Sequence, residues 1–348
     1  PLSIDFLRQL GVWDMIPTVR KSYYQKMHVW DQSGTASIAF DSAELYRDDL
    51  GAIVENKYII TALAECLESQ DNVVSFYDSK VASIEQIDGG SGRKITFEGK
   101  VDSIRCKLVI AADGANSRIR TWSGITTREW DYQQHAIVAT VKTEKRHEQV
   151  ARQRFGDSGP VAFLPLYDQD DSQRYCSIVW SQEVEEAQAL MSLSDRDFLS
   201  RLRLESEGIL GDIIDVSPRF SYPLRQRHAK TYTKNGIVLV GDAAHTVHPL
   251  AGQGANLGFK DVMSLCDELL SANNRDIELN DQVILKRYQR RRQADNLIMM
   301  GAMEGFKRLF EQKNPLVRLL RNTGMGWVNG QSILKDKIMR LAMGISES

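Results

Sequence analysis

The strongest hydrophobic pattern in the chain covers residues 236–261. Within it, Ile237 to Val240 form an unbroken run of β-branched and leucine side chains, which is typical of a strand buried on both faces. The run stops at Gly241-Asp242, and Phe259 to Leu270 then has apolar residues at helical spacing. The pattern therefore predicts a strand, a loop and a helix in succession.

A second run of the same kind, Cys106 to Ala112, predicts another buried strand and is followed directly by Asp113-Gly114. Because an aspartate follows each buried strand, we expect Asp113 and Asp242 to be two sites on one face of a sheet. Periodicity predicts further helices over Ile4 to Leu10, Lys57 to Glu68 and Gln282 to Met303, and strands over Met27 to Asp31, Ala36 to Asp41, Val73 to Tyr77, Val81 to Ile87 and Lys94 to Phe97.

The pattern changes between Trp130 and Trp180, where alternating strands succeed one another without a helix. Such a succession is typical of an antiparallel sheet, and the amphipathic segment Asp195 to Leu204 would cover it as a helix. The sequence therefore predicts a mixed α/β fold with two domains. The first is expected over residues 1–20, 51–125 and 225–290, the second over residues 21–50 and 126–224, and a C-terminal helical region over residues 291–348.

Composition supports globular domains and argues against some classes of function. The chain has 348 residues, of which 42% are hydrophobic, and 44 Lys and Arg face 46 Asp and Glu, so its net charge is -2. No nucleic-acid partner is expected, because no general basic field is present. The cysteines Cys66, Cys106, Cys176 and Cys266 have neither zinc spacing nor a dense disulfide pattern, so they are expected to be reduced thiols in the core of a cytosolic protein.

The loop after Asp242 is rich in glycine, with Gly252, Gly254 and Gly258 around Asn256. Glycines let a backbone approach a ligand closely, and the free N–H groups at the start of a helix favour anionic or electron-rich atoms. The loop is therefore expected to hold a ligand that carries or develops negative charge.

Two strings carry a resemblance to a known family. GDAAHTVHPLAGQGANLGF at residues 241–259 resembles the second flavin-binding motif of the class A flavoprotein monooxygenases, and DGANSRIR at residues 113–120 resembles their DG motif. The resemblance implies the para-hydroxybenzoate hydroxylase fold. That fold combines a Rossmann-type FAD domain, here without its first βαβ elements, with an antiparallel-sheet substrate domain and C-terminal helices.

The resemblance also implies roles for individual residues. Asp242 would bond the ribityl chain of FAD, Pro249 would lie beside the isoalloxazine, and the loop from Gly252 to Asn256 would cap the pyrimidine end of the ring. The DG turn would serve FAD, and its arginine would help to hold the pyridine nucleotide. The implied cofactor-binding residues are Asn56, Asp113, Gly114, Asp242, Pro249, Gly252, Gln253, Gly254, Ala255 and Asn256. For Asn56, contact with the phosphate or adenine side of FAD and a helix N-cap are equal alternatives.

The sequence of residues 241–259 is most similar to that of the subgroup that hydroxylates polyprenylphenols in ubiquinone biosynthesis. The resemblance implies that NAD(P)H reduces FAD and that oxygen added at the flavin C4a position delivers a hydroxyl group to the ring of a polyprenylphenol. No catalytic side chain is assigned. Hydroxylation of a later ring position or of another aromatic substrate, and a non-catalytic assembly subunit with this fold, remain alternatives.

Other chemistries lack their parts. His245 and His248 could join Asp242 as metal ligands, but Gly241 and Pro249 place them in a loop instead of on one helix face, so no metal is expected. The sequence contains no Gly-x-Ser-x-Gly elbow and no phosphate-binding Gly-Lys-Ser/Thr. Acyl transfer and nucleotide hydrolysis are therefore not predicted.

The family's usual GxGxxG turn for the FAD pyrophosphate is not found in the printed sequence. We expect the chain to be a C-terminal portion of a longer hydroxylase, and we expect this portion to lack at least the roughly 30 residues of one βαβ unit. Such a portion would bind FAD poorly.

No run approaches the roughly 18 apolar residues of a membrane span. The arginines Arg287, Arg290, Arg291 and Arg292 form a basic stretch, which indicates either a solvated helix face or contact with lipid headgroups or a partner protein. Other ubiquinone-biosynthesis proteins are the expected partners, and peripheral contact with the inner membrane is compatible with a polyprenyl substrate.

Overall fold

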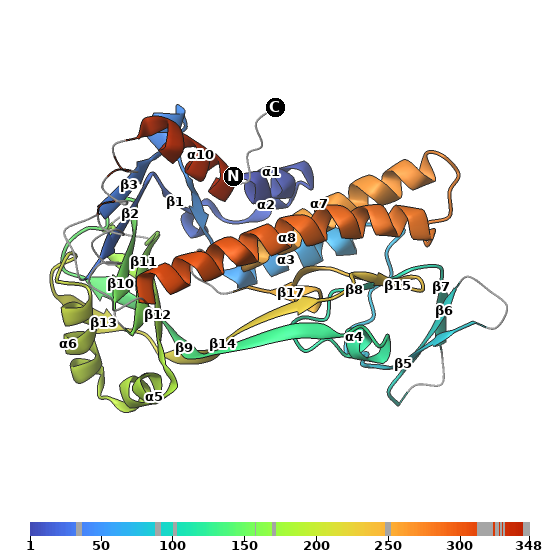
Figure 1. Ribbon diagram of the computed structural model, residues 1–348, viewed down its shortest axis with the longest axis horizontal. Helices are drawn as coiled ribbons and strands as arrows, with labels where there is room; N and C mark the ends of the chain where they lie inside the picture. The colour runs from blue at the N-terminus through green and yellow to red at the C-terminus, as the bar shows by residue number, and fades with distance from the viewer. Residues whose placement is uncertain are drawn as a thin grey trace. The chain divides into compact units, whose positions relative to one another are not determined.

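The computed structural model describes residues 1–32, 37–87, 92–99, 103–156, 158–168, 172–247, 252–311, 323, 327, 329 and 331–343 (Figure 1). The helices are α1 (Leu2–Gln9), α2 (Val12–Met15), α3 (Asn56–Glu68), α4 (Arg118–Trp122), α5 (Val184–Ser192), α6 (Asp195–Glu205), α7 (Gly254–Asn273), α8 (Gln282–Glu311) and α10 (Ser332–Met343), with short 3₁₀ turns η1 (Thr18–Arg20), η2 (Ser42–Leu45) and η3 (Gly241–Ala243). The strands are β1 (Ser22–Tyr24), β2 (Lys26–Asp31), β3 (Ser37–Asp41), β4 (Gly51–Ile53), β5 (Val81–Gln86), β6 (Arg93–Phe97), β7 (Ser103–Cys106), β8 (Val109–Ala111), β9 (Thr127–Thr143), β10 (Val150–Gly156), β11 (Gly159–Leu166), β12 (Tyr175–Glu183), β13 (Ile213–Val216), β14 (Phe220–Ala229), β15 (Thr233–Lys234), β16 (Ile237–Leu239) and β17 (His245–Thr246).

The chain forms two compact units. Unit 1 contains Pro1–Gln70, Gln133–Leu224 and Gly305–Ser348, and unit 2 contains Asp71–Tyr132 and Arg225–Glu304. The long strands β9 and β14 each begin in one unit and end in the other. Residues 1–20 and 51–70, predicted for the flavin-type domain, group with unit 1 by compactness; the functional assignment of the domains remains a prediction.

Unit 1 is built on a sheet in the order β9-β12-β11-β10-β2-β3, with β13 also paired to β9. The neighbours from β9 to β10 are antiparallel, as the alternating pattern predicts, whereas β10 and β2 are parallel. In β11 every second residue is buried, so one face of the sheet forms the core under α5 and α6. Trp180 of β12 meets Phe198 of α6 there, with ring centroids 5.7 Å apart.

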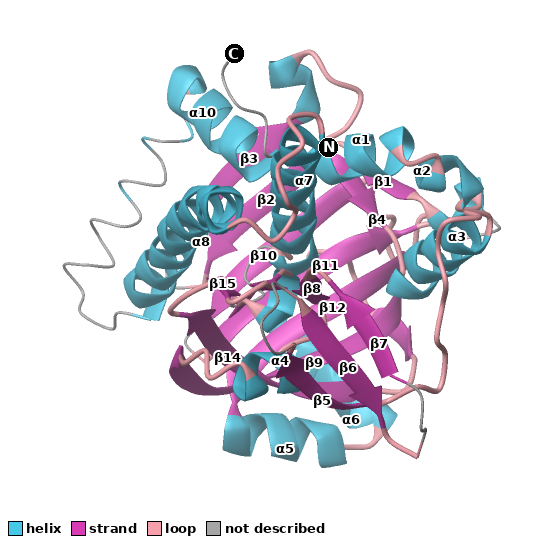
Figure 2. Cartoon of the chain, turned by 90° about the vertical axis from the view of Figure 1, so that its right-hand side faces the viewer, coloured by secondary structure: helices cyan, strands magenta, loops and turns pink. Residues whose placement is uncertain are grey.

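Unit 2 contains a three-stranded sheet in the order β15-β16-β8. Strands β16 and β8 are parallel, and Leu239 is opposite Ala111. Val238 and Leu239 are completely buried, which confirms the predicted buried strand. Helices α7 and α8 contribute Leu265, Leu285 and other side chains to the same core. Strands β5, β6 and β7 form a separate antiparallel sheet (Figure 2).

Two strand predictions in unit 2 are wrong. Residues 73–77 form no strand, and Val74 and Tyr77 are 74% and 63% exposed. Their β propensity is not matched by a ladder, since no described strand pairs with this segment. The run from Cys106 to Ala112 serves two sheets instead of one: Cys106 ends β7 opposite Arg93, and the buried strand begins only at Val109.

Candidate functional site

The two motifs lie side by side in unit 2. Parallel strands β8 and β16 end together, and the Val240 amide donates to the Ala111 carbonyl at 3.1 Å. Asp113 follows the end of β8 by two residues, and Asp242 lies in η3 directly after β16. Each aspartate therefore follows a buried strand, as predicted, and the structure shows in addition that these strands are parallel neighbours.

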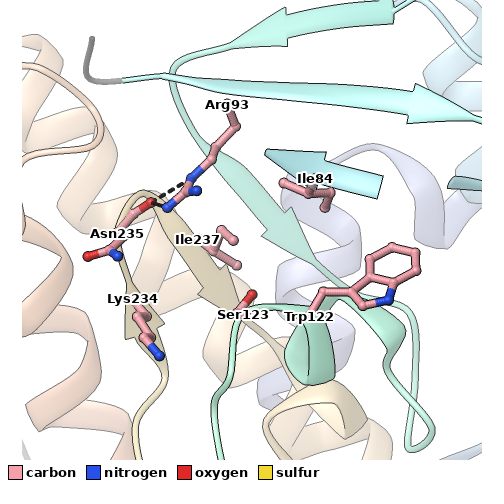
Figure 3. A pocket seen from close by; sticks show the side chains of 7 residues that line it. All are labelled: Ile84, Arg93, Trp122, Ser123, Lys234, Asn235 and Ile237. Carbon is pink, nitrogen blue, oxygen red and sulfur yellow. Dashed lines mark hydrogen bonds between the residues drawn. The ribbon is translucent and has the colours of Figure 1, made fainter. Parts of the chain in front are cut away.

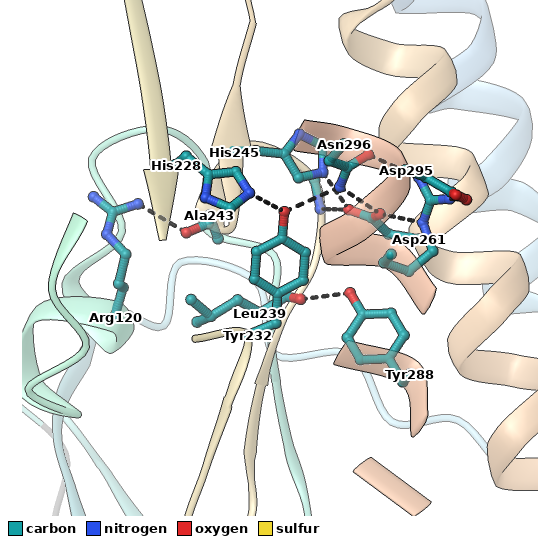
Figure 4. Close-up of polar contacts among 12 residues, drawn as sticks. Arg120, His228, Tyr232, Leu239, Ala243, His245, Asp261, Tyr288, Asp295 and Asn296 are labelled. Carbon is teal, nitrogen blue, oxygen red and sulfur yellow. Dashed lines mark hydrogen bonds and ion pairs between the residues drawn. The ribbon is translucent and has the colours of Figure 1, made fainter. Parts of the chain in front are cut away.

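Arg120 of α4 fastens the turn after β8 to the turn after β16 (Figure 4). Its side chain is buried, and its Nη1 donates to the Ala243 carbonyl at 2.8 Å while its Nη2 donates to the Ala115 carbonyl at 2.9 Å. Loss of solvent on burial, with the nearby charge of Arg227, lowers the pKa of Arg120. One cation thus bridges both motifs through their backbone carbonyls.

The carboxylate of Asp113 organises the DG turn. It accepts hydrogen bonds from Ser117 Oγ at 2.6 Å and from the Ile119 amide at 3.2 Å. Ser117 Oγ in turn accepts from the Arg120 amide at 2.9 Å and so caps α4. Gly114 has a φ of 78°, a left-handed conformation that suits glycine at this turn. Asp113 therefore sets the start of the helix that carries Arg120.

The Asp242 side chain is exposed and forms no hydrogen bond or ion pair with the residues that the structure describes. Partial desolvation raises its pKa, although the nearby His245 acts in the opposite direction. At the start of α7, Gln253 makes no side-chain cap bond, and Asn256 Nδ2 lies 3.4 Å from Gln253 Oε1. A free carboxylate and an uncapped helix start thus belong to the same motif.

Glycines let α7 approach the Asp242 turn. A Cβ on Gly258 would lie 3.5 Å from the Cα of Gly241, so the helix and η3 are in backbone contact. Gly252, with a φ of 60°, leads into Gln253, Gly254 and Ala255 at the start of α7. Pro249, together with His248, lies outside the described residues.

These features fit the cofactor that the sequence implies. A ribityl chain presents hydroxyl groups, and the free carboxylate of Asp242 can accept hydrogen bonds from them. The amides of the first turn of α7 favour an electron-rich ring. FAD would thus be held by Asp242 and by the loop from Gly252 to Asn256, with the DG turn beside them.

Asn56 belongs to unit 1, as the first residue of α3. The preceding Glu55 occupies the N-cap position, and α3 has no side-chain cap bond. The geometry therefore gives no support to the alternative that Asn56 caps this helix.

Replacing Asn56 with alanine should change the free energy of unfolding of the apoprotein by less than about 0.5 kcal/mol, because no cap bond is lost. Thermal unfolding measures this, with exposed Glu65→Ala on the same helix as the control. A loss of more than about 1 kcal/mol would show that Asn56 caps α3 after all.

Sequence reasoning missed a buried polar cluster beneath the Asp242 turn (Figure 4). Its centre is Asp261 of α7, which is completely buried. The Asp261 carboxylate lies 2.6 Å from His245 Nε2 and 2.8 Å from Arg292 Nε, and the Gly241 amide donates to it at 3.0 Å. Burial alone would raise the pKa of Asp261, but the hydrogen bonds and charges of His245 and Arg292 outweigh it and hold that pKa below its usual value.

The prediction for the basic stretch of α8 is wrong for Arg292. Its side chain is 3% exposed and points into the protein as the partner of Asp261. Arg287 and Arg291 are exposed and form longer ion pairs with Glu268 and Asp267 of α7. Helical spacing could have flagged the difference, since Arg292 falls on the side of α8 that carries the buried Leu285 and Tyr288.

Unit 2 also contains two hollows whose linings do not include Asp242. A cavity of about 220 Å³ lies at the opposite end of β16 from Asp242 (Figure 3); Arg93 there donates to the Asn235 carbonyl, and Ile237 and Trp122 are among its walls. A shallow groove of about 620 Å³ runs beside the DG turn, where Arg120 and Arg227 are among the lining residues.

Comparison with known proteins shows the family to which the chain belongs. The FAD binding domain family matches residues 1–297. The chain is 35% identical over 343 residues to 3-demethoxyubiquinol 3-hydroxylase of Escherichia coli (strain K12), covering 99% of this chain and 85% of that protein. It is also 35% identical over 384 residues to the mitochondrial ubiquinone biosynthesis monooxygenase COQ6 of Homo sapiens, covering 98% and 80%.

Solved structures show the same fold at low identity. The p-nitrophenol 4-monooxygenase PnpA of Pseudomonas putida DLL-E4 superposes with a TM-score of 0.77 at 19% identity, over 100% of this chain and 87% of that one. The probable FAD-dependent monooxygenase pqsL of Pseudomonas aeruginosa gives a TM-score of 0.75 at 19% identity, over 92% of this chain and 86% of that one.

The chain belongs to the FAD-binding family, as the resemblance predicted. It is an FAD-dependent monooxygenase with the para-hydroxybenzoate hydroxylase type of fold.

Proposed function

We propose that this monooxygenase hydroxylates the ring of a polyprenylated phenol or quinol in ubiquinone biosynthesis, using NAD(P)H and O2. The observation that carries the proposal is the free carboxylate of Asp242 beside the uncapped start of α7, in a chain similar over nearly its whole length to two ubiquinone-pathway enzymes. The sequence favours a 2-polyprenylphenol as substrate. The Escherichia coli relative is named for a later precursor, so a demethoxyubiquinol is the close alternative.

The residues divide the work of holding the cofactor. Bound FAD would supply the redox and oxygen chemistry that side chains cannot provide. Asp242 would hold the ribityl chain, and the amides from Gly252 to Asn256 would stabilise negative charge on the pyrimidine end of the flavin ring. The sequence resemblance assigns Pro249, which lies outside the described residues, to the same ring. Asp113 and Gly114 would shape the second wall of the site, and Asn56 remains the residue that the sequence resemblance assigns to the phosphate or adenine side of FAD.

Asp242→Ala should weaken FAD binding by about 10- to 100-fold, because a hydrogen bond to a charged group contributes roughly 1.5–3 kcal/mol. Fluorescence titration of the full-length apoprotein with FAD measures the dissociation constant. Exposed Asp267→Ala of α7 is the control and should leave it unchanged. Equal affinities for the Asp242 variant and the wild type would remove this residue from the site.

Partners and location follow from the substrate. We expect association with other proteins of the ubiquinone pathway and peripheral contact with the membrane that holds the polyprenyl chain. The exposed Arg287 and Arg291 are compatible with anionic headgroups. Within the described ranges, every helix is too short or too polar to cross a bilayer.

Product analysis with alternative substrates tests the function. The full-length protein is supplied with FAD, NAD(P)H and, in separate reactions, a short-chain 2-prenylphenol, a short-chain demethoxyubiquinol and a hydroxybenzoate. Hydroxylation of either prenylated ring, with none of the hydroxybenzoate, supports the proposal and identifies the ring position. Hydroxylation of the hydroxybenzoate alone would overturn it, and no turnover of any of them would favour an assembly role.

A further inference from the structure

Asp261 collects donors from three separate elements. Its Oδ2 accepts from the Gly241 amide of η3 at 3.0 Å and from His245 Nε2 of β17 at 2.6 Å. Its Oδ1 accepts from Arg292 Nε of α8 at 2.8 Å and lies 3.4 Å from Asn296 Nδ2. An ionised carboxylate offers about four lone-pair positions and no donor, so this environment uses its whole accepting capacity.

The cluster continues in one direction from the carboxylate. Arg292 Nη2 donates to Asn296 Oδ1 at 2.9 Å, and Asn296 Nδ2 donates to the Tyr232 hydroxyl at 3.1 Å. The Tyr232 hydroxyl lies 3.0 Å from His228 Nε2 and can donate its own proton to a neutral His228. With Asp261 charged and His228 neutral, every step of this arrangement has a donor and an acceptor.

Asp242 lies between the two residues of its own turn that Asp261 holds. Gly241 precedes it and His245 follows three residues later, whereas the Asp242 side chain itself is exposed. Arg120 holds the intervening Ala243 carbonyl from the other side. The backbone on both sides of Asp242 is therefore fixed, and the position of its carboxylate depends on these anchors.

We propose that Asp261 is a positioning residue for the flavin: its buried carboxylate, balanced by Arg292, fixes the Gly241–His245 turn against α7 and α8 and so aims Asp242 at the ribityl chain. The inference rests on FAD binding at Asp242 and not on the identity of the aromatic substrate. Positioning in this sense requires an oxygen atom that faces the Gly241 amide, and not merely a filled core.

A double-mutant cycle separates these two requirements. In Asp261→Asn the new side-chain amide has one oxygen, whereas the Asp261 carboxylate faces one pair of donors on each of its two oxygens. Because Arg292 stays protonated, the oxygen turns toward Arg292. The amide nitrogen then faces the Gly241 N–H, and two donors oppose each other. The FAD dissociation constant of the full-length protein should rise by about tenfold or more. In the double variant Asp261→Asn with Arg292→Met, the oxygen can turn back to Gly241, and the affinity should recover to within about threefold of wild type.

The double variant Asp261→Leu with Arg292→Met is the matched comparison. It has the same charge balance and the same number and branching of side-chain heavy atoms at position 261, but it has no oxygen for the Gly241 amide. Exposed Arg291→Met is the control for removing a cation from α8. For every variant, flavin fluorescence titration gives the FAD affinity and circular dichroism gives the unfolding midpoint of the apoprotein.

We expect the FAD affinity to depend on whether residue 261 offers an oxygen atom to the Gly241 amide, and not on the unfolding midpoint of the variant. The asparagine double variant should bind FAD about tenfold or more tightly than the leucine double variant, even where their midpoints agree. Equal affinities of the two double variants, or an affinity of Asp261→Asn that does not recover on adding Arg292→Met, would overturn it. If the leucine variant does not fold, the asparagine cycle alone decides. None of these readouts uses the aromatic substrate, so the outcome is independent of the proposed hydroxylation.

Discussion

Replacing Arg120 with methionine should destabilise the protein by about 3–5 kcal/mol and abolish tight FAD binding, because it removes two charge-assisted hydrogen bonds from a buried site. The Ala243 carbonyl then loses the Arg120 hydrogen bond that ties it to the DG turn. Since Arg120 joins the turns that carry Asp113 and Asp242, both halves of the flavin site should loosen together. Denaturant unfolding and FAD titration measure the two effects.

Arg118→Met is the matched control for this prediction. Arg118 begins the same helix, but its side chain is about half exposed and pairs with Glu98 at the surface. This control should change the free energy of unfolding by less than about 1 kcal/mol. If the two variants behave alike, Arg120 does not bridge the motifs.

Acidification should destabilise the protein by up to about 3 kcal/mol between pH 6.5 and about pH 4, through His228. Burial, followed by the nearby charges of His245 and Arg128, lowers the pKa of His228 from 6.5 to about 4. Below pH 6.5 the unfolded chain therefore binds a proton that the folded protein does not. The contribution of His228 to the free energy of unfolding is complete above pH 6.5, and it is lost as the pH falls towards the folded-state pKa.

Unfolding midpoints measured across this range for wild type and His228→Gln test the prediction. The variant should lose part of the dependence on pH, since glutamine does not titrate and can still accept from Tyr232. His135→Gln, at a half-buried histidine hydrogen-bonded to Ser221, controls for the general effect of losing an imidazole. Parallel pH profiles for wild type and His228→Gln would show that His228 is not the sensitive group.

Local patterns predicted the parts of the fold that depend on neighbouring residues. The run from Ile237 to Val240 predicted the buried strand β16, and Asp242 follows where this strand ends. The parallel neighbour β8 ends beside it and is followed by Asp113. Alternation likewise predicted the antiparallel strands β9 to β12. The segment 73–77 shows the limit of this reasoning, because strand propensity without a partner ladder gives no strand.

The Asp261 cluster could not be predicted in the same way. Asp261 lies at the end of the 236–261 stretch, where a charged residue in a helix normally faces solvent. Its partner Arg292 is 31 residues further on in a run of arginines, and only the packing of α8 against α7 selects it over its neighbours. Charge patterns along the sequence locate candidates for ion pairs, but tertiary packing decides which of them are buried.

The most direct test of the account is to run the reaction of the full-length protein under heavy-isotope oxygen gas with FAD, NAD(P)H and a short-chain prenylated phenol or quinol. The product should contain one oxygen atom derived from the gas, and Asp242→Ala at a limiting FAD concentration should form far less of it. A hydroxyl group whose oxygen comes from water, or NAD(P)H oxidation without any labelled product from any prenylated ring, would contradict the assignment of this chain as a ubiquinone-pathway hydroxylase.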